Sequence, residues 1–138
     1  MNRVKYLIVP AISLFLAVSF NYADVIGKTD TGIQAVAEPI LDGILSGLAT
    51  TNYEKYTKDF DVMLKEMVSE AKFGEMSRQI NGSIGKQQSR KYLCFLNKEG
   101  MTVVLWKAKF DNTNDDVLIK LVISKKEDEC FVSGIWFQ

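Results

Sequence analysis

The chain has no histidine, and this limits the chemistry that its side chains can do. Ser-His-Asp and Cys-His nucleophilic sites need an imidazole base, and many metal centres need histidine ligands. Carboxylates, tyrosines, lysines and two cysteines remain. A carboxylate base beside a tyrosine in an apolar pocket is sufficient for isomerase-type proton transfer, so a site of this type is the catalytic alternative that stays open.

Asp59 and Asp61 are the candidate bases, because they flank Phe60 in a stretch of helical periodicity that also contains Tyr53 and Tyr56. Helical geometry argues against both. Phe60 belongs to the apolar stripe, and residues one position away are rotated by about 100° toward the edge of the helix or the solvent. No catalytic residue is therefore assigned.

Four aromatic residues are the candidates for lining a pocket for a small apolar ligand, namely Tyr56, Phe60, Tyr92 and Trp106. They lie on an apolar helix stripe and on predicted strands, where aromatic side chains either pack in a core or line a cavity. Binding of this kind needs no cofactor, and none is predicted.

The segment DNTNDD (111–116) superficially resembles a calcium-binding loop. Asp116 stands at the sixth position, where such a loop needs glycine, and Val122 stands at the twelfth, where it needs glutamate. Asn and Asp are common in turns, so the segment is predicted to be a hairpin turn and no metal site is assigned. The Gly85-Lys86 pair likewise lacks the spacing of a phosphate-binding loop.

The last third of the chain predicts a sheet. Apolar, β-branched and aromatic runs at 101–110, 117–124 and 130–138 read as consecutive antiparallel strands, preceded by a strand at 89–97. Alternation places one all-apolar set toward the core: Val104, Trp106, Ala108, Phe110, Val117, Ile119, Leu121 and Ile123. The outer face then carries Val103, Leu105, Lys107, Lys109, Leu118, Lys120 and Val122, with Arg90 and Lys91 nearby.

Three helices are predicted before this sheet. The first carries an apolar stripe from Ile33 to Leu48, and Pro39 either begins its main part or bends it. The second begins at a capping box of Thr51 and Glu54, and its apolar face consists of Tyr53, Tyr56, Phe60, Met63, Leu64 and Met67. The third is capped by Ser69 and ends at Asn81-Gly82. Helices followed by an antiparallel sheet indicate an α+β domain.

Several short motifs now resemble a known family. They are AEPILDGIL (37–45), NYEKYTKDFD (52–61), Gly85 with Lys86 and Ser89, KAKF (107–110) and VSGIWF (132–137). Together they resemble a family of uncharacterised small prokaryotic domains with the nuclear-transport-factor-2-like fold, also called cystatin-like or SnoaL-like. The resemblance implies a cone in which a curved four-stranded sheet wraps three helices, often around a pocket. It implies no catalytic residues, because this fold serves both isomerases and binding modules.

The N-terminus resembles a secretory signal peptide. Arg3 and Lys5 precede an apolar run from Tyr6 to Phe20, and the first acidic residue is Asp24. A helix of about fifteen residues spans about 22 Å, less than a hydrocarbon core of about 30 Å. We therefore expect residues 1–23 to be a signal peptide cleaved between Ser19 and Ala23, with 24–138 as one domain. An uncleaved N-terminal membrane anchor is the alternative.

The net charge of the mature chain limits the kinds of partner that it can bind. Loss of Arg3 and Lys5 leaves a net charge of about −2, which offers no electrostatic basis for binding nucleic acid.

Cys94 and Cys130 fall on the first and last predicted strands, about 14 Å apart in a simple meander. Because disulfide Cα atoms lie within about 7 Å, two free and mostly buried thiols are expected.

The sequence therefore predicts an exported, non-enzymatic domain that binds a small apolar ligand or a protein of the cell envelope. An isomerase- or hydrolase-like enzyme with a carboxylate–tyrosine site and an auxiliary dimerisation module are the alternatives. The outer sheet face mixes apolar residues with only three lysines on its two central strands, so a homodimer through that face is also predicted.

Overall fold

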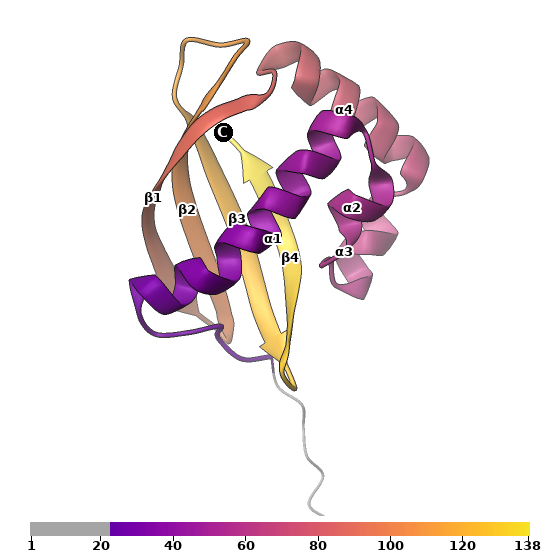
Figure 1. The fold of residues 1–138 in the computed structure, drawn as a ribbon. Helices are drawn as coiled ribbons and strands as arrows, with labels where there is room; N and C mark the ends of the chain where they lie inside the picture. Colours follow the sequence, from indigo (N-terminus) through magenta and orange to yellow (C-terminus); the bar gives the residue numbers. More distant parts are fainter. Residues whose placement is uncertain (1–22) are drawn as a thin grey trace, which may run out of the picture.

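The computed structural model describes residues 23–138, in which four helices precede a four-stranded antiparallel sheet (Figure 1). The helices are α1 (Asp30–Thr50), α2 (Tyr53–Thr57), α3 (Val62–Met67) and α4 (Glu70–Ser83). The strands are β1 (Gln87–Lys98), β2 (Met101–Phe110), β3 (Val117–Lys126) and β4 (Glu129–Phe137). The predicted α+β class is confirmed. The predicted cleavage region up to Tyr22 lies outside the described residues.

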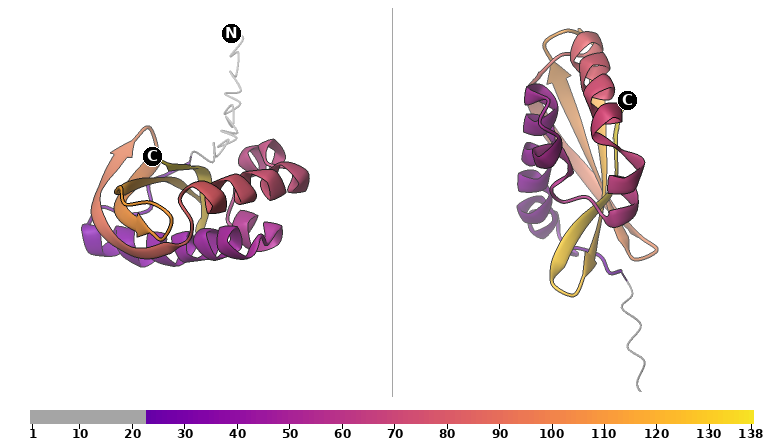
Figure 2. Two further views of the ribbon diagram at one scale, coloured as in Figure 1. Left: turned by 90° about the horizontal axis from the view of Figure 1, so that it is seen from above. Right: turned by 90° about the vertical axis from the view of Figure 1, so that its right-hand side faces the viewer.

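The sheet is a meander of order β1-β2-β3-β4 that curls strongly when it is viewed end-on (Figure 2). Helix α1 lies across one face, and α2, α3 and α4 gather beside β4 (Figure 1). The predicted inner face is confirmed, because all eight alternate apolar residues of β2 and β3 are at most 5% exposed. They form one core with the apolar stripe of α1.

Helix α1 continues through Pro39, so the main helix does not begin there. Thr29 caps its N-terminus, where the threonine side chain accepts a hydrogen bond from the amide of Gly32. The helix ends at Thr51, whose left-handed backbone (φ 52°) turns its amide back to the carbonyls of the last turn. Thr51 is therefore a C-cap, and the predicted capping box of Thr51 and Glu54 is wrong.

The predicted second helix is two short helices, which brings the number of helices in the described chain to four. Asn52 caps α2 and Asp61 caps α3, each through its side-chain oxygen. Between them the chain pairs with β4, where the amide of Val132 donates to Asp59 and the amide of Asp61 donates to Val132. This bridge holds Phe60 in the core and turns α3 outward, so Met63 is 74% exposed and not buried as predicted.

Helix α4 begins as predicted, with the Ser69 side chain accepting from the amide of Lys72, and it runs slightly beyond Asn81-Gly82 to Ser83. The two cysteines lie on the opposite edge strands β1 and β4, and both are free. Cys94 is exposed, because it faces outward opposite Leu105, so the expectation of two mostly buried thiols is wrong for this residue.

The segment before α1 is tied across the end of the sheet. Asp24 forms two backbone hydrogen bonds of 2.8 Å with Lys125, close to the turn between β3 and β4. The amide of Ile26 then donates to the hydroxyl of buried Thr102, which itself donates to Asn97. Within the described residues, no helix has the length and apolarity needed to cross a bilayer.

Gly47 should be essential for the packing of α1 on α2. A Cβ atom at this position would lie 2.5 Å from the backbone nitrogen of Tyr56, whereas a Cβ at Gly43 on the same helix meets nothing within 4 Å. We expect Gly47→Ala to lower the free energy of unfolding by about 1–3 kcal/mol through overpacking. The control Gly43→Ala should raise it by up to about 1 kcal/mol through helix propensity. Urea denaturation measures both, and equal stabilisation by the two changes would contradict the close contact.

Candidate functional site

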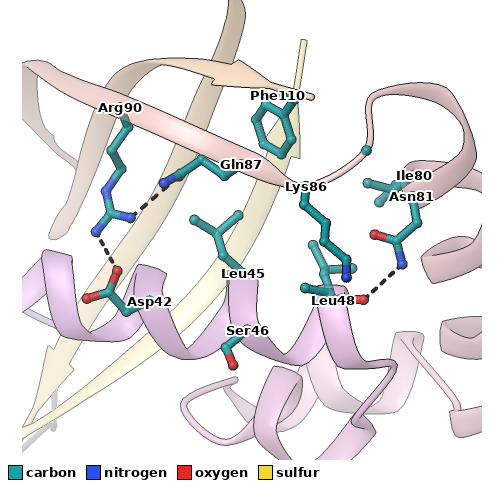
Figure 3. A pocket seen from close by; sticks show the side chains of 12 residues that line it. Asp42, Leu45, Ser46, Leu48, Ile80, Asn81, Lys86, Gln87, Arg90 and Phe110 are labelled. Carbon is teal, nitrogen blue, oxygen red and sulfur yellow. Dashed lines mark hydrogen bonds and ion pairs between the residues drawn. The ribbon is translucent and has the colours of Figure 1, made fainter. Parts of the chain in front are cut away.

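An open cavity of about 280 Å³ lies between α1, the end of α4 and the start of β1 (Figure 3). Its apolar wall is formed by Leu45 and Leu48 of α1, Ile80 of α4 and Phe110 at the end of β2. Its charged residues are Asp42, Lys86 and Arg90. Most ligand pockets combine such an apolar wall with a few polar groups.

The chain reaches this cavity through a tight turn between α4 and β1. Gly85 has a φ of +82°, and a Cβ there would lie 1.9 Å from a carboxylate oxygen of Asp111. Asp111 sits in that space because its carboxylate accepts the amide of Lys86 at 2.8 Å. Asn112 adds a hydrogen bond of 2.6 Å to the carbonyl of Gly82. The 111–116 segment is thus the predicted turn between β2 and β3, and its first two residues fasten α4 to β1.

A partly buried hydrogen-bond network lies beside the cavity. Glu38 of α1 accepts the indole N–H of Trp106 at 2.7 Å through Oε1 and the Nε of Arg90 at 2.9 Å through Oε2. Nη2 of Arg90 also binds Glu38 and reaches Asp42 at 2.6 Å. The Arg90 side chain is only 16% exposed, and that of Trp106 is inaccessible. Helix α1 is therefore joined to β1 and β2 by two carboxylates and one guanidinium.

The charge of Arg90 is stabilised where it lies. Burial opposes the charged form, but hydrogen bonds from the guanidinium to Asp42 and Glu38 outweigh it and raise the pKa of Arg90. The sequence prediction placed Arg90 near the outer-face lysines, and this is wrong. Arg90 is the register partner of Ala108, which belongs to the inner set, whereas Lys91 pairs with the outward Lys107.

The four aromatic residues predicted to line a pocket form two separate pairs. Tyr92 and Trp106 pack edge to face with ring centroids 6.4 Å apart, and the Tyr92 hydroxyl donates to Asp30 at 2.7 Å. Burial, helped by this hydrogen bond, raises the pKa of Tyr92. Tyr56 and Phe60 pack together at 4.9 Å, and both are buried. None of the four lines the cavity beside α1.

Asp61 and Asp59 have structural partners. Asp61 caps α3 through its carboxylate, and Asp59 lines a second, more open hollow of about 380 Å³. The other residues that line it are Ile40, Lys58, Glu129, Cys130 and Phe131. Burial raises the pKa of the Cys130 thiol, which makes it a weaker nucleophile at neutral pH. No group of three or more histidine, cysteine or acidic residues in 23–138 is arranged to hold a metal ion. The cavity beside α1 is the better site for an apolar ligand, because apolar side chains from three elements line it. In the hollow beside Asp59, three of the six lining residues are charged, namely Lys58, Asp59 and Glu129.

The sequence analysis missed Asp42, Lys86 and Glu38 as site residues. Glu38 and Asp42 lie four positions apart on the helix that carries the core stripe, and Arg90 lies two positions before Tyr92 on a strand. Such spacings put charged side chains beside an apolar face, and this was the available signal. No protein-family model matches the chain, and no curated protein sequence matches it.

Glu38 should contribute to stability through its two buried donors. Glu38→Gln keeps an acceptor for the indole of Trp106 but removes the charge that offsets Arg90. Because hydrogen bonds to charged groups contribute about 1.5–3 kcal/mol and Glu38 is partly accessible, we expect the free energy of unfolding to fall by about 1–2 kcal/mol. The exposed Glu75→Gln on α4 is the matched control and should change it by less than about 0.5 kcal/mol. If Glu38→Gln and Glu75→Gln changed the free energy of unfolding equally in urea denaturation, the stabilising role of Glu38 would be refuted.

Proposed function

We propose that the chain is a non-enzymatic domain that binds a small, largely apolar ligand in the cavity beside α1. The observation that carries this proposal is the combination of an apolar wall and a rim with few charges. Leu48 and Phe110 are at most 5% exposed, yet both border the cavity. At about 280 Å³ the cavity falls just below the usual range for drug-sized ligands, so the ligand is small.

We further propose that this domain has the cone-shaped cystatin-like or SnoaL-like fold and that it is exported. The curled sheet with α1 across one face supports the first point, as does the position of the cavity between helices and sheet (Figure 2). The apolar run behind Arg3 and Lys5 supports the second. A small ligand or an envelope protein is the partner class that such a location makes available.

Ligand binding can be tested with octan-1-ol, which is uncharged and largely apolar. Titration of the purified protein should shift the amide resonances of Leu45, Ile80 and Phe110, with a Kd on the order of 1 mM for so small a molecule. Leu45→Trp fills the cavity and should weaken binding at least tenfold. Leu93→Trp, on an exposed part of β1, is the matched control and should leave the Kd unchanged.

The two variants separate the outcomes. Wild-type affinity in Leu45→Trp would place the binding elsewhere on the protein. Absence of any shift at several millimolar octan-1-ol would remove small-ligand binding as the function.

We also propose that two copies pair through the outer sheet face. Cross-strand neighbours there form rows of apolar residues, in which Leu96, Val103 and Val122 are successive partners. Leu96 is 58% exposed and Trp136, on the same face of β4, is 45% exposed. A second copy supplies an identical apolar patch, as a two-fold interface requires. Asp116 lies 2.8 Å from Lys109 and 3.9 Å from Lys107, which reduces the repulsion between facing lysines.

Pairing through this face predicts a dimer that a central charge weakens. Leu105→Lys or Leu118→Lys should raise the dimer Kd at least tenfold, because a new ammonium group would be desolvated in the interface. Val62→Lys is the control, since Val62 is 73% exposed and lies on α3, which is not part of the outer sheet face. Sedimentation equilibrium measures all three. A wild-type monomer at tens of micromolar, about the range of weak dimers, would refute the proposal.

A further inference from the structure

The charged side chains around the cavity differ in whether they have an ion-pair partner. Of its three charged lining residues, Arg90 and Asp42 bind each other, and Arg90 also binds Glu38. Lys86 is different, because its ammonium group forms no hydrogen bond or ion pair with any residue in the described part of the chain. The carboxylate of Asp111 accepts the backbone amide of Lys86, and no ion pair joins this carboxylate to the Lys86 ammonium group among the described residues.

Hydrogen bonds fix the backbone of Lys86, whereas its ammonium group is free to bind a ligand. Its amide donates to the Asp111 side chain at 2.8 Å, and its carbonyl accepts the Asp111 amide at 2.9 Å. Figure 3 shows the side chain extending from the turn just before β1 toward Leu48 of α1, across one end of the cavity. A preorganised backbone with one free cation beside an apolar wall lowers the entropic cost of binding an anionic group there.

We propose that the ligand is an amphipathic anion, whose carboxylate binds Lys86 while its apolar body packs against Leu45 and Phe110. This inference rests on the proposed ligand-binding function and adds the chemical class of the ligand. At the opposite end of the cavity, the cluster of Arg90, Glu38 and Asp42 carries a formal charge of −1, so an anionic group is favoured at the Lys86 end alone. The site thereby also orients the ligand.

The test compares three probes of equal chain length: octanoate, octan-1-ol and octylamine. We expect octanoate to bind the purified protein about fivefold more tightly than octan-1-ol at low ionic strength, as an accessible ion pair contributes. This preference should disappear at about 0.5 M salt, where the Debye length is only a few ångströms. Octylamine should bind no more tightly than octan-1-ol.

Variants assign the preference to one side chain. Lys86→Gln should abolish the preference for octanoate, so that octanoate and octan-1-ol bind this variant with similar Kd values. Lys98→Gln, an exposed lysine at the far end of β1, should leave both affinities unchanged.

The outcomes distinguish this inference from the proposed function. Equal binding of octanoate and octan-1-ol would keep the ligand cavity and overturn the anionic class. Tighter binding of octylamine would also overturn it and would make Asp42 the anchor. A preference for octanoate that survives in Lys86→Gln would overturn the role of Lys86, and absence of binding by octan-1-ol would refute the proposed function itself.

Discussion

The hydrogen bonds that Glu38 accepts from Trp106 and Arg90 determine how α1 sits on the sheet. A buried indole N–H and a guanidinium that is only 16% exposed both need acceptors, and one carboxylate on α1 satisfies both. The apolar stripe of the helix alone could slide along the sheet, because apolar contacts are not directional. The network of Glu38, Arg90 and Trp106 adds direction, since its hydrogen bonds of 2.5–2.9 Å allow little movement of α1 against β1 and β2.

The cavity lies along α1 just beyond this hydrogen-bond network. On its far side α1 carries Leu45 and Leu48, which face the start of β1 and the end of α4. The chain between those two elements is held away from α1 by the Gly85 turn and its hydrogen bonds to Asp111 and Asn112. Apolar side chains of α1, α4 and β2 therefore approach one another but leave the cavity between them unfilled. The turn that prevents closure also positions Lys86, whose ammonium group has no partner among residues 23–138. The shape of the site and this cation therefore have the same local cause.

The sequence was most informative where periodicity is simple. Strict alternation in β2 and β3 predicted the inner set of side chains, because the side-chain period of a strand is two. It did not predict that Val122 and Ser124, on the outer face of β3, are also buried. It failed where a local interaction interrupts a period. The pairing of Asp59 and Asp61 with Val132 splits the second helix and exposes Met63, and this contact joins residues more than 70 positions apart. In β1, irregular register near Gln87 and Tyr92 disturbs the alternation, and Arg90 between them was placed near the wrong face. The cavity itself depends on the relative positions of α1, α4 and β1, which no single segment specifies.

The two proposed binding surfaces use opposite faces of the same strand. At the end of β2, Phe110 borders the cavity, while its neighbour Lys109 points to the outer face and binds Asp116. A ligand packed against Phe110 and a second copy packed on the outer face therefore would not compete for the same atoms. Any coupling between them would have to pass through the backbone of β2, which is hydrogen-bonded on both sides within the sheet and is therefore rigid. The proposal of ligand binding and the proposal of self-association are for this reason independent, and refuting one would leave the argument for the other intact.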